Sequence, residues 1–459
     1  MNRLNNQKTE NVRAIALEVL VQMEKEKEYS HVLIHQVLEK YDYMDIKDKA
    51  FLKRLLYGTI ERTIQLDYVI NSFSKTPVKK MKPVIRCILR MSVYQLLCMD
   101  SVPDAAVCNE ACKLAEKKGF HTLKGFVNGI LRAIARGRES IVYPDKEKEP
   151  VRALSVEYSV AEWLVSMWIR EYGEETTVAM LKGFLEERPV TVRWSERLSE
   201  SEREAYLKQW TKAGVSFHKS ELMANAVHIT ECSGVKDLAG FAEGAFYVQD
   251  ISSMLAVRAA DIRENDFVLD VCAAPGGKSI YAAELTGEDG TVVARDITEY
   301  KTAMIAENAE RMRCDQVRVQ CRDASVLDER MIERADVVLA DLPCSGLGII
   351  ARKPDIKYNC SEESLKEVVC LQKKIIDTIW QYVKPGGTLL YSTCTLNREE
   401  NVEMVQYILE HYPYELVEFQ EDLRLPDSAV RELPGTCQLL PGLDETDGFF
   451  FARLKRKDA

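Results

Sequence analysis

Two cysteines lie at the ends of two predicted strands, where a thiol could act as a nucleophile. Cys344 occurs in Asp-Leu-Pro-Cys-Ser-Gly at 341–346, and Cys394 occurs in Tyr-Ser-Thr-Cys-Thr at 391–395. Both follow a glycine-containing loop at 270–278, Asp-Val-Cys-Ala-Ala-Pro-Gly-Gly-Lys. Because the thiolate is the nucleophilic form of cysteine, this combination predicts a cofactor-dependent enzyme that attacks a base through a thiolate.

Each of these cysteines could instead be a structural thiol in the core. The chain has 13 cysteines, without a Cys-x-x-Cys pair or a histidine at metal-ligand spacing. Neither a disulfide framework nor a metal site is therefore predicted. A single free cysteine is most often a buried structural thiol. The position of Cys344 and Cys394 at strand ends, inside these motifs, favours the catalytic interpretation.

The loop at 274–278 indicates the cofactor class. It lacks the spacing of the dinucleotide fingerprint and of the phosphate-binding P-loop, which disfavours NAD and ATP. Its adjacent glycines, Gly276 and Gly277, let the backbone approach a ligand closely. Predicted strands also end in carboxylates at Asp296, Asp323 and Asp341. Such groups can bind a ribose or an amine at the edge of a doubly wound sheet, although Asp296 and Asp323 could instead cap a helix. S-adenosylmethionine fits this set.

The elements that must position these residues alternate between strand and helix from residue 267 onward. Strands are predicted at 267–271, 291–294, 317–320, 337–340, 388–391 and 449–454. Helices are predicted between them, notably at 299–313, 364–383 and 398–411. This alternation builds a parallel sheet with helices on both faces, and ligands bind at the carboxyl ends of its strands. We therefore expect a Rossmann-like α/β domain at 246–459.

The N-terminal part differs in both pattern and charge. Residues 9–138 show apolar side chains at helical spacing throughout, which predicts an all-α module at 1–140. The chain carries a net charge of −10, but residues 1–140 contain 24 Lys plus Arg against 16 Asp plus Glu, a net +8. The densest cluster is Lys75, Lys79, Lys80, Lys82, Arg86 and Arg90. Such a cluster suits a phosphate backbone, and a solvated helix face explains it equally well.

Between these parts, residues 151–245 predict a small α+β domain. A polar linker flanked by prolines at 142–150 precedes it, and it contains a short strand at 190–194 and a charged helix at 199–213. The chain has no run of about 18 apolar residues, and its start is polar rather than an apolar leader. We therefore expect a cytoplasmic protein with no membrane partner.

The motifs together resemble the RNA cytosine-C5 methyltransferases of the Nol1/Nop2/Sun group. The similar segments are 270–278, 341–346, 352–357, 384–387, 392–394 and 399–401. The helical N-terminus is similar to the NusB domain of one bacterial branch, at 66–71, 93–97 and 125–132. The resemblance covers nearly the whole chain. It implies a NusB-like RNA-binding domain at 1–140, an α+β RNA-binding subdomain at 151–245 and a class I methyltransferase domain at 246–459.

The same resemblance implies the substrate and the cofactor site. The substrate would be a cytosine of 16S ribosomal RNA, free or within a partly assembled small subunit, and the methyl donor S-adenosylmethionine. The cofactor loop would comprise Cys272, Ala273, Ala274, Pro275, Gly276, Gly277 and Lys278. Asp296 would hold the ribose, Asp323 the adenine, and Asp341 would lie at the methionine end near the cytosine.

Cys394 matches the family's nucleophile and Cys344 its second cysteine. Carbon 5 of cytosine is a poor nucleophile, so a thiolate must first add at carbon 6. Asp341, protonated or sharing a proton, would support nitrogen 3 as charge builds there. Cys344 would then assist loss of the carbon-5 proton and release of the thiol.

The target base must reach the thiol unpaired, in a loop or flipped out of a helix. Arg352, Lys353 and Lys357 follow the Cys344 motif and are candidates for holding RNA phosphates, with a plain solvated loop as the alternative. Arg193 in the α+β domain is a further candidate RNA contact.

Two other functions stay open at this level. A NusB-like RNA-binding or assembly factor could carry an inactive methyltransferase fold, although the intact cysteines and aspartates argue against it. A methyltransferase for exocyclic amines would have an Asn/Asp-Pro-Pro-aromatic loop in place of 342–344.

Overall fold

The computed structural model describes residues 11–26, 30–41, 43–232 and 234–458, and their contacts divide the chain into two units. The first unit extends to Leu185 and includes the later segment Lys353–Asn359. The second contains Glu186–Arg352 and the chain from Cys360 onward. None of the helices in these described ranges is long and apolar enough to cross a membrane.

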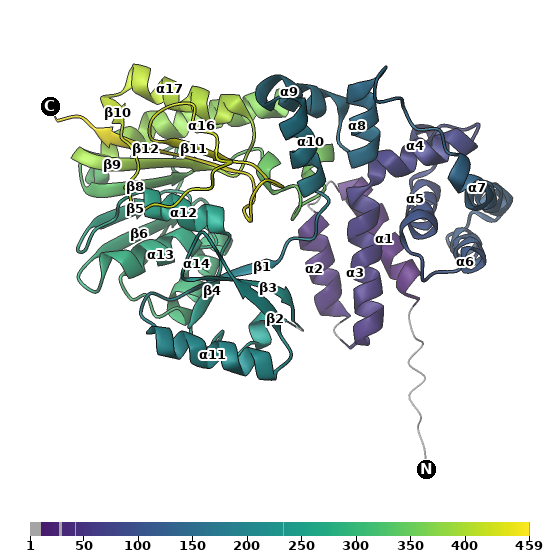
Figure 1. Ribbon diagram of the computed structural model, residues 1–459, viewed down its shortest axis with the longest axis horizontal. Coiled ribbons are helices and arrows are strands. Elements are labelled where there is room, and N and C mark those ends of the chain that lie inside the picture. Colours follow the sequence, from purple (N-terminus) through teal and green to yellow (C-terminus); the bar gives the residue numbers. More distant parts are fainter. Residues whose placement is uncertain (1–10, 27–29, 42, 233, 459) are drawn as a thin grey trace, which may run out of the picture. The chain divides into compact units, whose positions relative to one another are not determined.

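The first unit is helical, which confirms the predicted all-α N-terminal module (Figure 1). Its helices are α1 Val12–Glu26, α2 Ser30–Lys40, α3 Ile46–Glu61, α4 Thr63–Phe73, α5 Pro83–Cys98, α6 Asp104–Lys117, α7 Lys124–Gly137, α8 Pro150–Tyr158, α9 Glu162–Tyr172 and α10 Glu174–Gly183. The contacts group α8–α10 with this unit, and the boundary of the α+β domain at 151–245 stays a prediction.

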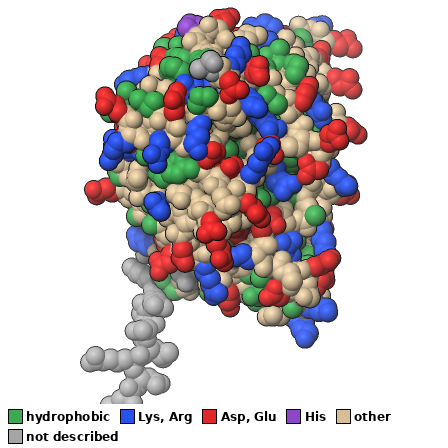
Figure 2. Space-filling model, turned by 90° about the vertical axis from the view of Figure 1, so that its left-hand side faces the viewer, with side chains coloured by type: hydrophobic (Ala, Val, Ile, Leu, Met, Phe, Trp, Pro, Cys, Tyr) green, Lys and Arg blue, Asp and Glu red, His purple; other side chains and the backbone are tan. Residues whose placement is uncertain are grey.

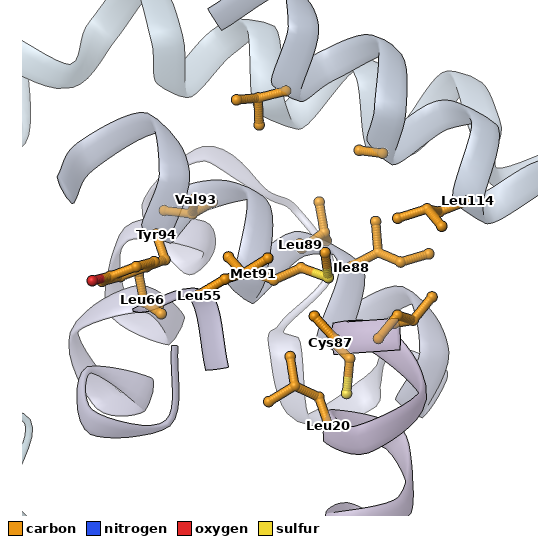
Figure 3. Packing of buried hydrophobic residues seen from close by; sticks show 14 of the residues in the cluster. Leu20, Leu55, Leu66, Cys87, Ile88, Leu89, Met91, Val93, Tyr94 and Leu114 are labelled. Carbon is orange, nitrogen blue, oxygen red and sulfur yellow. The ribbon is translucent and has the colours of Figure 1, made fainter. Parts of the chain in front are cut away.

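Helix α5 lies at the centre of this unit's core. Its buried side chains meet Leu20 of α1, Leu55 of α3, Leu66 of α4 and Leu114 of α6 (Figure 3). The approach of α3 to α5 needs a glycine, because a Cβ at Gly58 would lie 2.0 Å from the ring carbon Cζ of Tyr94. A helix that is apolar around most of its circumference is expected to be buried in this way.

The basic cluster at 75–90 divides into internal arginines and external lysines. Arg90 pairs with Glu24 at 2.7 Å and with Asp67 at 2.6 Å, and Arg86 pairs with Glu24 at 2.5 Å. The exposed members are Lys75, Lys79, Lys80 and Lys82. Among the described residues these four lysines form no ion pair, so they present the exposed charge of the cluster to solvent.

The segment 353–359, here called the strap, packs among the helices of the first unit. Its last four residues form the short helix α15, Ile356–Asn359. Asp355 accepts hydrogen bonds from the backbone N–H of Ser30, at 3.0 Å, and from its hydroxyl. The hydroxyl of Tyr358 donates to the backbone carbonyl of Glu61 at 2.7 Å. The chain thus leaves the second unit at Arg352 and returns to it at Cys360.

The second unit begins with a four-stranded antiparallel sheet in the order β2-β3-β1-β4. Its elements are β1 Val190–Trp194, α11 Glu200–Lys212, β2 Ser216–Lys219, β3 Ala226–Glu231 and β4 Phe246–Val248. The predicted strand at 190–194 and the predicted charged helix are confirmed. Trp194 and Trp210 stack with ring centroids 5.0 Å apart in the core of this sheet.

An eight-stranded sheet forms the rest of the unit, in the order β10-β12-β9-β8-β5-β6-β7, with β11 paired to β12. The strands are β5 Phe267–Asp270, β6 Thr291–Asp296, β7 Val317–Cys321, β8 Ala335–Asp341, β9 Val383–Thr393, β10 Tyr414–Leu416, β11 Thr436–Leu439 and β12 Phe449–Arg456. All six predicted strands are present. The expectation of a parallel sheet was wrong for one edge, because β12 runs antiparallel to β9, β10 and β11.

Helices cover both faces of this sheet, as predicted (Figure 1). They are α12 Ile251–Ala259, α13 Gly277–Thr286, α14 Glu299–Arg311, α16 Glu362–Ile379 and α17 Val402–His411. Successive residues of β5 point to opposite faces, so Val268 packs with α12 and α13 while Leu269 packs with α16 and α17. The carboxyl ends of the parallel strands are left to carry the site.

Candidate active site

The parallel strands β5, β8 and β9 bring the predicted catalytic residues to one edge of the sheet. Asp341 at the end of β8 lies opposite Ser392 of β9 and accepts a hydrogen bond from its hydroxyl at 2.9 Å. Lys278, in the first turn of α13, donates to the other oxygen of Asp341 at 2.6 Å. Cys344 and Cys394 follow directly after β8 and β9. The structure therefore places the two thiols and the Lys278–Asp341 ion pair together.

The sulfur atoms of Cys344 and Cys394 lie 3.3 Å apart. Hydrogen bonding to Cys394 and burial together raise the pKa of Cys344 well above the ordinary value for a thiol. A proton retained on Cys344 can be donated to the sulfur of Cys394.

Lys278 is the cation of this site. Burial alone would lower the pKa of its ammonium, but the Asp341 carboxylate outweighs that effect and the pKa is raised. The ammonium also lies 5.1 Å from the ring centroid of Phe449 on β12. We expected Asp341 to be protonated or to share a proton. In the ion pair, the proton available for sharing is the one on Lys278.

The loop that precedes α13 has a backbone conformation that depends on glycine. Gly276 has φ +107°, a value that side-chain-bearing residues rarely adopt. A Cβ at Gly277 would lie 2.9 Å from ring carbon Cε1 of the buried Tyr247. The loop is tied to the second strand by the N–H of Ala274, which donates to Asp296 at 3.0 Å. The loop backbone is therefore fixed beside the ends of β5 and β6.

The residues at these strand ends fit S-adenosylmethionine. Asp296 does not cap the helix that follows, because Thr298 does so. Asp323 accepts the N–H of Ser325 at 2.8 Å, which lowers the pKa of its carboxyl. This bond closes a turn, since the next helical segment begins only at Glu329. Asp323 nevertheless stays half-exposed and free to accept from an amine. Exposed apolar side chains adjoin these carboxylates in sequence, at Ile297, Val326 and Leu327.

Asp270 is a site residue that the sequence reasoning missed. One carboxylate oxygen accepts from the hydroxyl of Ser279 at 2.6 Å, and the other is buried with no hydrogen bond of ordinary geometry among the described residues, although the backbone N–H of Cys272 is near enough to lower the pKa of this carboxyl. Burial raises the pKa of Asp270 to about 7. A buried polar atom without a partner calls for a ligand group or a water, and the amino group of a methionine moiety would satisfy it. The sequence could have indicated Asp270 as a site residue, because it ends the first strand of the sheet, β5.

Arg193 cannot contact RNA in this structure, which corrects our expectation for it. Its side chain is fully buried and pairs with Glu284, which is 1 % exposed. The guanidinium also lies over the ring of Tyr281, 4.0 Å from its centroid. This arginine satisfies a buried carboxylate and leaves no room for a phosphate.

Two of the three candidates that follow the Cys344 motif, Arg352 and Lys357, lie in surroundings that we did not expect. Arg352 pairs with Asp447 and, at 3.0 Å, with Asp250, so its charge is already compensated. Lys357 is 1 % exposed, and burial lowers the pKa of its amine to about 7. Burial therefore excludes Lys357 as a surface phosphate ligand. Arg352, whose side chain is 33% exposed, stays a prediction as an RNA contact. Lys353 is half-buried in the strap.

The described residues gather no group of three or more histidine, cysteine or acidic side chains arranged to hold a metal ion. On the face drawn in Figure 2, acidic and basic side chains are interspersed.

Three family models match successive parts of the chain. They are the NusB family at residues 10–136, the RsmF/B-like ferredoxin-like domain at 160–236 and the 16S rRNA methyltransferase RsmB/F model at 257–455. The probable ribosomal RNA small subunit methyltransferase B of Bacillus subtilis (strain 168) is 36% identical over 461 residues, covering 98% of this chain and 100% of that protein.

A relative and a solved structure extend the comparison. The ribosomal RNA small subunit methyltransferase B of Cronobacter sakazakii is 30% identical and spans 98% of this chain and all of that protein. The crystal structure of PH0851 is similar with a TM-score of 0.81 at 24% identity, covering 97% of this chain and 99% of that one. The structural likeness supports the fold.

Proposed function

Because this chain belongs to the family of 16S rRNA methyltransferases RsmB/F, we propose that it methylates carbon 5 of a cytosine in 16S ribosomal RNA with Cys394 as the nucleophile. The observation that carries the proposal is the contact between the thiols of Cys344 and Cys394, 3.3 Å apart beside the Lys278–Asp341 ion pair. A single thiol in a core would need neither a second thiol nor a buried ion pair at its side.

The cofactor of this reaction is S-adenosylmethionine, which supplies an electrophilic methyl group when it is bound. The loop at 272–278 would hold it with backbone groups, while Asp296 and Asp323 would accept from its ribose and adenine. Asp270 would accept from its amino group through the carboxylate oxygen that has no hydrogen bond of ordinary geometry among the described residues. These residues would hold the cofactor at the carboxyl ends of β5, β6 and β7.

The first step of the proposed mechanism is attack on the base. The Cys394 thiolate, stabilised by the S–H of Cys344, forms a bond to carbon 6 of cytosine, and electron density moves toward carbon 5 and nitrogen 3. The proton shared by Lys278 and Asp341 stabilises the charge on nitrogen 3. Carbon 5 then becomes nucleophilic enough to accept the methyl group.

The second step is release, and here Cys344 changes role. In the adduct, Cys394 is a thioether, and Cys344 no longer donates to a thiolate. Once the proton of Cys344 has passed to solvent, its sulfur accepts the proton from carbon 5. The bond between carbon 6 and the Cys394 sulfur then breaks, the electron pair returns to the ring, and Cys394 leaves as a thiolate.

RNA binding would involve the helical unit. The four exposed lysines at 75, 79, 80 and 82 are not neutralised as Arg86 and Arg90 are. Clustered lysines bind a phosphate backbone without reading its sequence. We infer that they help to hold the ribosomal RNA while the thiol site acts on one base.

Denaturing gel electrophoresis with labelled 16S RNA tests the assignment of the two thiols. With substrate and cofactor present, Cys394→Ala should form neither product nor a covalent RNA adduct. Cys344→Ala should still attack and methylate, but it should accumulate a protein–RNA species that resists denaturant. Cys370→Ala removes an exposed thiol from α16 and serves as the matched control with normal turnover.

Two outcomes would contradict the assignment. An adduct with Cys394→Ala and none with Cys344→Ala would mean that the roles are exchanged. Normal turnover without an adduct in Cys344→Ala, at a stability loss of about 1–2 kcal/mol, would mean that this thiol is only structural.

A further inference from the structure

Glu400 is a buried carboxylate that contacts the segments carrying both cysteines. One of its oxygens accepts from the backbone N–H of Ser345 at 2.9 Å, and the other from the hydroxyl of the same residue at 2.5 Å. The side-chain amide of Asn397 donates to it at 3.0 Å, and that of Gln372 at 3.1 Å. Ser345 follows Cys344 directly, and Asn397 is three residues after Cys394.

These four donors occupy all the acceptor positions of an ionised carboxylate. The backbone of Glu400 is held as well, because the hydroxyl of Tyr391 on β9 donates to its carbonyl oxygen at 2.5 Å. A direct bridge between the loops adds to the arrangement, since the hydroxyls of Ser345 and Thr395 lie 2.6 Å apart. Every contact of the Glu400 side chain therefore links the two cysteine segments to each other or to α16.

The charge of Glu400 is unusual for its surroundings. The side chain is 0% exposed, and within the described residues its carboxylate forms no ion pair. Burying a carboxylate without a cation costs folding free energy, because its hydrogen bonds replace only part of the lost hydration. An uncharged residue would stabilise a plain core better.

We propose that Glu400 is a positioning residue that clamps the Cys344 loop against the Cys394 loop and thereby holds the two thiols in contact. The inference rests on the proposed function for its catalytic meaning, but the clamp itself is a property of the free protein. Its negative charge also contributes to the raised pKa of Cys344. The clamp thus favours both the distance between the thiols and the retention of the proton on Cys344.

A proximity measurement tests the clamp without any methyl transfer. Diamide removes one hydrogen from each of two adjacent thiols, joins the sulfur atoms and is itself reduced to the hydrazine. Formation of the Cys344–Cys394 disulfide, followed by peptide mass spectrometry, should be about ten-fold slower in Glu400→Gln than in the unchanged protein. The Gln side chain keeps the shape of Glu but loses the charge and one acceptor oxygen.

Two further readouts separate positioning from general loss of stability. Alkylation of Cys344 by iodoacetamide should begin at lower pH in Glu400→Gln, while calorimetry should show S-adenosylmethionine affinity within about two-fold of the unchanged protein. Glu284→Gln, which alters a buried carboxylate that does not contact the cysteine loops, is the matched control. It should lower the melting temperature and leave the rate of disulfide formation unchanged.

Unchanged disulfide formation and alkylation in a folded Glu400→Gln protein would overturn the proposal. If that variant does not fold, Ser345→Ala and Asn397→Ala decide, since each removes donors to the same carboxylate. Slower disulfide formation in these variants supports the clamp, and rates equal to those of the unchanged protein refute it. Absence of methylated RNA with the unchanged protein, together with absence of an RNA adduct with Cys344→Ala, would count against the proposed function alone.

Discussion

Replacing Arg193 by methionine should destabilise the second unit by about 3–5 kcal/mol, because it leaves a buried carboxylate without its partner. In the structure the guanidinium pairs with Glu284, donates to the side chain of Gln249 at 3.0 Å and lies 4.0 Å from the ring centroid of Tyr281. Removing the charge strands Glu284, which is 1 % exposed. The cost therefore comes mainly from the uncompensated negative charge.

Urea unfolding followed by tryptophan fluorescence measures this cost, since Trp194 adjoins Arg193 and stacks on Trp210. At a slope of about 1–3 kcal/mol per molar urea, the midpoint should fall by more than about 1 M. A double variant, Arg193→Met with Glu284→Met, should recover part of the loss because it removes the stranded charge as well. Lys219→Ala, which breaks an exposed pair with Glu204, should cost only about 0–1 kcal/mol.

The opposite result would restore Arg193 as an RNA contact. In that case Arg193→Met would unfold at the same urea concentration as the unchanged protein. Its RNA affinity would fall, and the slope of log affinity against log salt would become shallower by about one.

Two other expectations follow from the site and the strap. Asp296→Ala or Asp323→Ala should each cost about 1.5–3 kcal/mol of S-adenosylmethionine affinity through a lost charge-assisted hydrogen bond, and calorimetry showing unchanged binding in both would reject the assignment. Lys357, with its pKa lowered to about 7 from 10.5, is charged in the unfolded chain and largely neutral in the folded one between those values. Its contribution to stability should therefore rise with pH from about 7 to 10.5, and Lys357→Met should abolish that rise in urea midpoints measured at both ends of the range.

The sequence predicted the catalytic cluster because parallel strands carry their chemistry at one edge. Once β5, β8 and β9 are recognised as parallel, Asp341, Cys344 and Cys394 must come together there. The direction of β12 was not predictable in the same way. Its apolar run at 449–454 predicts a buried strand. Such a run does not show whether the strand is parallel or antiparallel to its neighbours.

Arg193 shows why a predicted RNA contact can turn out to be buried. Along β1, Val192 and Trp194 face the small core, so alternation points Arg193 to the other face of the sheet. Tyr281 and Glu284 of α13 cover that face. Lys357 was predicted to be exposed because the residues near it in sequence are charged. It is buried by residues that are far away in sequence, such as Tyr158 and Glu61.

The strap sets an order of events during synthesis of the chain. Domains generally fold from the N-terminus as the ribosome releases them, yet Ser30 meets its partner Asp355 across 325 residues of sequence. Ser30 and the carbonyl of Glu61 in the first helices therefore lack their final hydrogen-bond partners until the strap has left the ribosome. The earliest helical unit to be translated is completed only when the catalytic half is well under way, so premature termination before residue 353 would leave both parts unfinished.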